Sequence, residues 1–125
     1  MATFTRFEDI PVWQDSRNLC ISIYQSTKRE PFNKDYRLCS QITAAAGSIM
    51  DNIAEGFERE GIKEFIQFLY IAKGSCGEVR SQLYRAHDVG YLSNEEYESL
   101  KKDSETLSAA LYNYIAYLKK TDIKG

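Results

Sequence analysis

Proline is scarce in this sequence, and its two residues, Pro11 and Pro31, both lie in the first third of the 125-residue chain. Proline ends or bends a helix because it has no backbone N–H and its ring clashes with the preceding turn. The chain beyond Pro31 therefore has no proline to limit helix length. Long apolar runs are missing too, and none approaches the roughly 20 residues of a membrane-spanning helix. We expect long helices and no membrane partner.

Cysteine and histidine are too few and too scattered for the usual metal or disulfide sites. Cys20, Cys39 and Cys76 are odd in number and form no C-x-x-C pair, which indicates small buried thiols in a reducing compartment. A single histidine, His87, cannot supply the paired Glu-x-x-His motifs of a carboxylate-bridged metal bundle. No nucleophile or orienting acid stands beside it, so we predict no catalytic residue, no metal and no cofactor. The polar N-terminus is unlike a signal peptide, which favours a cytoplasmic location.

Excess positive charge is also absent. The formal net charge is -2 and the pI about 5.5, whereas dedicated nucleic-acid binders are usually basic. Hydrophobic residues make up 43% of the chain and charged residues 27%, which is typical of globular proteins. The length favours one domain spanning residues 1–125.

Apolar residues recur at helical spacing in four segments, which predicts helices over about 12–28, 35–59, 62–89 and 94–120. No segment shows the alternation of a strand. Four amphipathic helices with short connections predict an all-α fold, an antiparallel up-down-up-down four-helix bundle.

Capping residues support these boundaries. Asp35 and Gly61 are acceptable N-caps of the second and third helices. Gly90 suits the left-handed position that ends a helix. Ser93, with Glu96 three residues later, forms the pattern of a capping box at the start of the fourth helix.

The third predicted helix carries more apolar surface than a bundle requires. A second apolar set lies beside its core-facing heptad seam: Ile62, Ile66, Phe68, Tyr70, Ile71 and Tyr84. A bundle helix normally has one apolar and one wet face, so we interpret this set as an interface with another subunit. The alternative is that it packs beneath the loop at 29–35.

The stretch "SIMDNIAEGFERE" (48–60) places polar Asn52 at the border of an apolar helical stripe. A polar residue there often fixes the register of packed helices. Counting from the turn near residue 60 brings Asn52 close to the third helix. We predict a structural hydrogen-bond cluster of Asn52, Glu55, Ser75 and Glu78, in preference to a catalytic site.

Several motifs resemble one known family. "NIAEGFERE" is followed by "KEFIQFLYIAKGSCGE", with "VWQDSRNL" and "IYQST" in the first helix, "LCSQITAAAGSI" in the second and "HDVGYLS" after the third. Together they are similar to the four-helix bundle proteins encoded in intervening sequences of bacterial 23S rRNA genes. The resemblance implies a bacterial protein that assembles as a ring-like homopentamer. It extends to the accessory protein of diversity-generating retroelements, a pentamer that binds nucleic acid and a reverse transcriptase through basic surfaces.

The sequence departs from that family where positive charge is usual. Thr43 and Ala44 occupy positions that often carry basic residues, and Gly61 replaces a capping serine. The remaining basic side chains are candidate nucleic-acid contacts: Arg37, Arg59, Lys63, Lys73, Arg80 and Arg85. The alternative is that these are solvated charges paired with Asp and Glu.

The leading interpretation is a non-enzymatic, homo-oligomeric scaffold or adaptor that acts through further copies of itself and a protein partner. The alternative is an RNA- or DNA-binding oligomer that repeats a basic patch around a ring, so that binding weakens steeply with salt.

Overall fold

The computed structural model describes the backbone of residues 4–124 and the side chains of residues 4–122. Its regular structure consists of four α-helices and two short 3-10 helices: η1 (Phe7–Asp9), α1 (Pro11–Thr27), η2 (Phe32–Lys34), α2 (Tyr36–Glu58), α3 (Ile62–Asp88) and α4 (Asn94–Lys124). The four predicted helices are confirmed. The first three begin and end within one residue of expectation, and α4 continues to Lys124, beyond its predicted end near residue 120.

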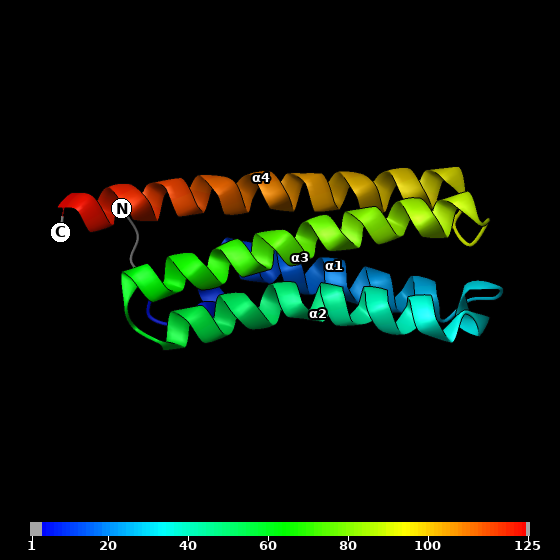
Figure 1. Cartoon of the computed structure of the whole chain (residues 1–125), viewed down its shortest axis with the longest axis horizontal. Coiled ribbons are helices and arrows are strands. Elements are labelled where there is room, and N and C mark those ends of the chain that lie inside the picture. Colours follow the sequence, from blue (N-terminus) through cyan, green and yellow to red (C-terminus); the bar gives the residue numbers. More distant parts are fainter. Residues whose placement is uncertain (1–3, 125) are drawn as a thin grey trace.

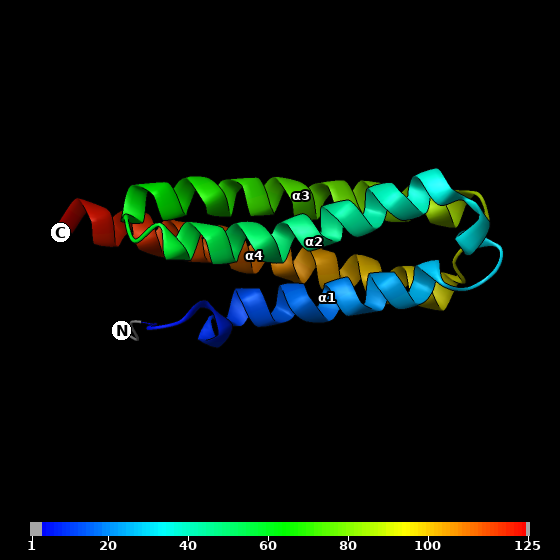
Figure 2. The same ribbon diagram turned by 90° about the horizontal axis from the view of Figure 1, so that it is seen from below.

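The four helices pack as an antiparallel bundle (Figure 1), and the chain reverses direction at each connection. Figure 2 shows the same reversals from below. α3 contacts α2 and α4, and α1 contacts the same two helices from the opposite corner. The fold class is therefore the predicted one, with α1 and α3 at diagonal corners.

The helix ends form as their capping residues predict. The Asp35 carboxylate accepts a hydrogen bond from the Leu38 amide at 3.0 Å, and Gly90 adopts a left-handed φ of 86°. The Glu96 amide donates to the Ser93 hydroxyl at 3.1 Å. The Glu96 side chain does not complete the capping box, because it turns to α1 instead.

The core is built from the predicted seams. In α3 the seam is fully internal: Phe65, Leu69, Ala72, Cys76, Val79, Leu83 and Ala86 are all buried. In α4, Ile115 lies in the core, and its neighbour Tyr114 is half-buried against the core.

Gly56 brings α2 against α3 more closely than a side chain would allow. A Cβ atom at this position would lie 2.5 Å from the Phe68 Cβ and 3.1 Å from a ring carbon of Phe65. Since real Cβ atoms do not approach so closely, the contact requires glycine here. Packing against α3, not helix propensity, therefore explains a glycine inside α2.

Candidate functional site

A small polar cluster joins α2 to α3 near the middle of the bundle. The Asn52 side-chain amide donates to the backbone carbonyl of Ser48 at 2.8 Å and to its hydroxyl at 2.9 Å. The Ser75 hydroxyl donates to the same Ser48 hydroxyl at 3.0 Å. The cluster thus consists of Ser48, Asn52 and Ser75, and it holds the two helices in register.

Two residues of the predicted cluster lie elsewhere. The Glu55 carboxylate accepts a hydrogen bond from Arg59 at 2.9 Å on the exposed side of α2. The Glu78 carboxylate lies 3.5 Å from the Gln82 side-chain nitrogen. The prediction is therefore corrected at Glu55 and Glu78, which do not join Asn52, and it missed Ser48.

The second apolar set of α3 divides into buried and exposed members. Ile66 lies in the core, and Ile62 packs partly buried against it, so these two add little to an external surface. Phe68 is half-buried beside Gly56. Three members remain outside: Tyr70, Ile71 and Tyr84 are 46%, 51% and 45% exposed. The loop at 29–35 does not cover them, because its Phe32 stacks on Tyr91 instead.

Lysines from α4 lie over the exposed tyrosines of α3. The Lys119 ammonium is 5.0 Å from the Tyr70 ring centroid, and the Lys101 ammonium is 5.4 Å from both Tyr84 and Tyr97. Ammonium groups at this distance attract the ring faces. The contacts bind α3 to α4 along their outer boundary.

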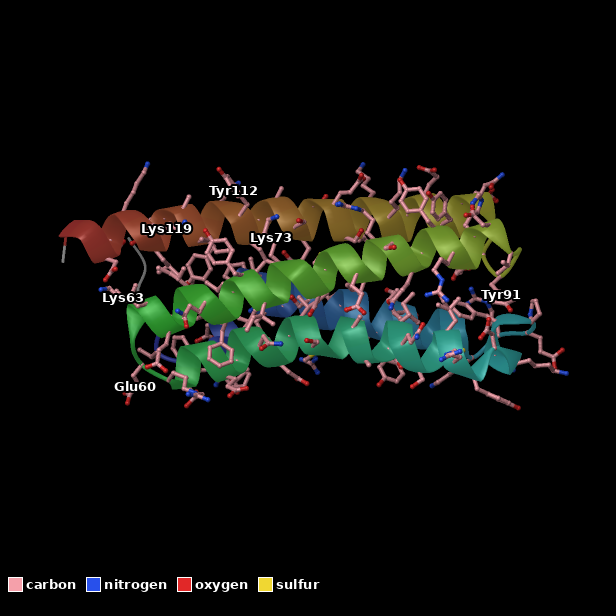
Figure 3. All side chains as sticks on the ribbon, in the orientation of Figure 1. Glu60, Lys63, Lys73, Tyr91, Tyr112 and Lys119 are labelled. Carbon is pink, nitrogen blue, oxygen red and sulfur yellow. The ribbon has the colours of Figure 1, made fainter. Side chains whose placement is uncertain are left out.

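This boundary forms one continuous surface, here called the α3–α4 strip: Tyr70, Lys73, Arg80, Tyr84, Lys101, Tyr112 and Lys119. Figure 3 shows Lys73 and Lys119 between the two helices and Tyr112 on α4. Tyr112 is 62% exposed. Arg80 lies two helical turns beyond Lys73 and shares its side of α3.

A hollow of about 480 Å³ lies between α2 and α3, on the adjacent face of the bundle. This α2–α3 groove is lined by Gln41, Ala44, Ala45, Ser48, Glu78, Ser81, Gln82 and Arg85. Gln82 is only 5% exposed, and its side-chain oxygen has no hydrogen-bond partner among the described residues. Small side chains thus leave a groove beside a buried acceptor that lacks a donor.

The six candidate nucleic-acid contacts do not form one patch. Arg59 lies at the α2–α3 turn and pairs with Glu55 and Glu64. Arg37 and Arg85 lie at the opposite end of the bundle, where Arg85 donates to Gln41 at 3.3 Å. Lys63 and Arg85 are separated by about 33 Å along α3 at 1.5 Å per residue. Lys73 and Arg80 share a different surface, the α3–α4 strip.

A charged contact ties α1 to the start of α4. The Glu96 carboxylate accepts a hydrogen bond from the Ser26 hydroxyl at 2.6 Å and a further one from Arg29. Partial burial opposes the negative charge, but the hydrogen bonds from Arg29 and Ser26 outweigh it, so the pKa of Glu96 lies below its ordinary value. Sequence reasoning placed Glu96 in a capping box and missed this role.

A second hollow, of about 750 Å³, opens at the end of the bundle formed by the α2–α3 turn and the last turns of α4. Phe57, Phe65 and Tyr114 form its aromatic wall, with Phe65 stacked edge-on against both neighbours. Thr5 and Thr121 also line it. The two ends of the described chain therefore meet at one end of the bundle.

Reactive groups are few and are engaged or buried. His87 stacks on Tyr97 with ring centroids 4.1 Å apart, and its Nε2 lies 2.6 Å from the Asn94 side-chain oxygen. Burial raises the pKa of the Cys76 thiol to about 11 and also raises the pKa values of Cys20 and Cys39. Thiols with raised pKa values are poor nucleophiles at neutral pH.

The described part of the chain has neither a candidate metal cluster nor a candidate membrane-spanning helix. Among those residues, no group of three or more His, Cys, Asp or Glu side chains is placed to hold a metal ion. None of the described helices combines the length and apolar character required to span a membrane.

The fold and its surfaces define the class of antiparallel four-helix bundle proteins. Within that class, the sequence matches the family described as 23S rRNA-intervening sequence protein over residues 8–113. The chain belongs to this family.

A solved structure has the same architecture. It is the 1.70 Å crystal structure of a protein with unknown function from the S23 ribosomal protein family of Bacteroides thetaiotaomicron. The two chains are 27% identical, with a TM-score of 0.76 over 83% of this chain and 97% of that one. No curated protein matches the sequence.

Proposed function

We propose that the chain is a non-enzymatic protein that works as a homo-oligomeric scaffold or adaptor. The observation that supports this most directly is the number of large side chains that α3 and α4 expose. Tyr70, Ile71, Tyr84 and Tyr112 are each between 45% and 62% exposed. Wide apolar surfaces of this kind usually mark sites of protein association.

The test is the solution mass of the protein, measured by light scattering over a hundredfold range of concentration. The scaffold proposal predicts a discrete oligomer, and the family resemblance favours five copies. A chain that remains monomeric at high micromolar concentration would contradict it. An activity that survives repurification and is lost on Glu55→Gln or Glu78→Gln would contradict the non-enzymatic assignment.

A second candidate function is binding of RNA or DNA by the oligomer. It is favoured by Lys63, Lys73 and Arg80, which form no ion pair within the described residues. Repetition around a ring would multiply these charges, and their release of counterions from phosphates would make binding strongly salt-dependent.

Filter binding with a mixed RNA pool at low and high salt tests this candidate. It predicts binding that weakens as salt rises and that falls further when Lys63, Lys73 and Arg80 are replaced together by Gln. Binding that is absent at low salt, or is insensitive to the triple replacement, would contradict a role for these residues.

A further inference from the structure

The hollow at the α2–α3 turn has the size and the walls of a small-molecule site. Its volume of about 750 Å³ lies within the range of about 300–1,000 Å³ that is usual for ligand pockets. Aromatic and aliphatic side chains from three helices line it, among them Phe57 of α2, Phe65 of α3 and Leu118 of α4. Because it lies at an end of the bundle, association through the sides of the helices would leave it open.

The aromatic rings of this hollow form a corner and not a flat stack. Phe57 and Phe65 have ring centroids 5.9 Å apart and ring planes at 78°. Phe65 and Tyr114 are 5.8 Å apart with planes at 84°, and Tyr117 also lines the hollow. The face of an aromatic ring carries partial negative charge, and several rings around one space are a common means of recognising ammonium ions.

The charged side chains of the hollow are acidic. Glu58 and Glu60 line it, whereas no lysine or arginine of the described residues does. Neither carboxylate forms an ion pair within the described residues. Arg59 stands between them in the sequence, but it pairs with Glu55 and Glu64 instead. The hollow therefore holds two carboxylates that no cation of the described chain neutralises.

The other groups around the hollow do not reverse this negative charge. α2 ends and α3 begins beside it, and the partial charges of these two helix ends have opposite signs, so they offset each other. Burial raises the pKa of Tyr114, which keeps its phenol uncharged at neutral pH. The sign of the local potential is thus determined by Glu58 and Glu60.

The backbone at Glu60 is a further sign that the hollow is a binding site. Figure 3 shows Glu60 at the α2–α3 turn, where its φ of 69° lies in the left-handed region that residues with a Cβ atom rarely adopt. Residues held in such conformations cluster at active sites and ligand-binding sites. A glycine would form the same turn without strain, but it would remove one of the two carboxylates.

We propose that this hollow binds an organic ammonium ion that carries an apolar group, of the kind found in an aryl-alkyl amine. The apolar group packs among the rings of Phe57, Phe65 and Tyr114, and the ammonium pairs with Glu58 and Glu60. This binding is independent of the scaffold function, because the hollow lies within a single copy of the chain.

Charge distinguishes the proposed ligand from other small apolar molecules. Transfer of its apolar part out of water favours binding whether or not the molecule is charged. The ammonium adds its attraction to the ring faces and to the two carboxylates. A neutral analogue loses this second contribution, and an anionic analogue is repelled.

Calorimetric titration with three probes of nearly the same shape tests this selectivity. Phenylbutylamine is protonated at neutral pH, phenylbutanol is uncharged, and phenylbutyrate is anionic. The amine should bind at one site per chain, about tenfold more tightly than the alcohol, and phenylbutyrate should bind more weakly than either. Equal binding of the amine and the alcohol would overturn the assignment of a cation. An amine that does not bind at millimolar concentration would overturn the site itself.

Glu58→Gln and Glu60→Gln test the two carboxylates. Each change keeps the shape of the side chain and removes its charge, so each should weaken amine binding by about threefold to fivefold and leave phenylbutanol binding unchanged. The double variant should lose more. Glu95→Gln alters an exposed glutamate at the opposite end of the bundle and should have no effect. Amine binding that survives the double replacement intact would contradict the pairing.

Tyr117→Leu tests the aromatic wall, with Tyr24→Leu as its control. Tyr117 lines the hollow and is half-buried, so leucine removes a ring while an apolar side chain remains. Amine binding should weaken by about fivefold. Tyr24 lies on α1, away from the hollow, and its replacement should leave the affinity unchanged. Equal affinities of the two variants would show that the ring of Tyr117 does not contact the ligand.

Thermal unfolding of the same variants separates lost binding from lost folding. Phenylbutylamine should raise the Tm of the wild-type protein, since it binds only the folded chain. The Glu58→Gln, Glu60→Gln protein should unfold cooperatively, as the wild type does, but show a much smaller rise with the amine. An equal rise in both proteins would place the ligand elsewhere and overturn the proposal. Solution mass, measured on the same samples, reports separately on the scaffold function.

Discussion

Glu60 has an unusual backbone conformation for a residue with a side chain. It ends the connection from α2 with a φ of 69°, a left-handed conformation that glycine adopts without steric cost. The next residue, Gly61, adopts an extended φ of -90°. The left-handed conformation therefore falls on Glu60 and not on the adjacent glycine, which could adopt it without strain. The chain therefore holds Glu60 in a strained conformation.

Glu60→Gly should accordingly raise the free energy of unfolding by about 0.5–1 kcal/mol, since relief of the left-handed strain exceeds the added flexibility of the unfolded chain. Urea denaturation measures the change. Glu105→Gly, at an exposed position within α4, serves as the control and should lower the same quantity by about 1 kcal/mol. A loss of stability in both variants would contradict the argument.

Residue types alone could predict only part of the polar cluster. Asn52 and Ser75 were predictable because helical spacing and antiparallel counting bring them together. Ser48 was not, since a helical serine bonds its own preceding turn as readily as another residue. Counting residues from the α2–α3 turn also places Glu55 and Glu78 near Asn52. Their carboxylate side chains are long, however, and can turn to water or to a cation on their own helix.

At the scale of the helices, close packing outweighs intrinsic preference at one position of α2. Gly56 leaves no room for a side chain against Phe68, whereas a Cβ at Gly47 of the same helix would meet nothing within 4 Å. Both glycines weaken an isolated helix equally. They differ only in the residues that face them, because α3 packs against Gly56 and no neighbouring side chain packs against Gly47.

The two positions should therefore respond oppositely to alanine. Gly56→Ala should lower the free energy of unfolding by about 1–3 kcal/mol, because the methyl group forces α2 and α3 apart. Gly47→Ala should raise it by about 0.5–1 kcal/mol through helix propensity. Thermal and urea denaturation of both variants provide the comparison, and stabilisation at Gly56 would show that the helices yield easily there.

The contact of Glu96 with Ser26 and Arg29 joins α1 to α4, so its protonation affects the packing of two elements. The folded-state pKa of Glu96 is lowered. Its stabilising effect is therefore present above the ordinary glutamate pKa of about 4.3 and is lost as the pH falls through the lower folded-state value.

Glu96→Gln should lower the free energy of unfolding at pH 7 by no more than about 1 kcal/mol, since the carboxylate is partly exposed and screened. The difference from wild type should shrink below about pH 4. Denaturation curves between pH 3 and pH 7 measure it. Glu95→Gln removes the neighbouring exposed carboxylate and serves as the matched control.

At the scale of the whole molecule, periodicity predicted the fold better than it predicted the surfaces. The four helices and the seam of α3 follow from apolar spacing, which determines the face that each helix buries. Spacing does not reveal which neighbour stands beside the remaining faces. For this reason the sequence did not single out Tyr112. It belongs to no apolar repeat of α4, and only the position of α3 beside it shows that it lies on a surface shared by the two helices.

If assembly stabilises the fold, the midpoint of thermal unfolding should depend on protein concentration. A hundredfold increase should raise Tm by several degrees, since association binds only the folded chain. Tyr112→Ala should reduce this dependence. Calorimetry at several concentrations measures both, and a Tm independent of concentration in the wild type would indicate that a single copy folds unaided.

The hollow at the α2–α3 turn, lined by both Thr5 and Thr121, also bears on protein engineering. Because the described chain starts and stops beside the same cavity, a short linker could join the two ends. The chain could then be opened between Asp88 and Asn94, at the far end of the bundle. Such a circular permutant would keep every helix and every helix pair of the original. It would present its new termini at the opposite end, so a fused domain could be attached at either end of the bundle.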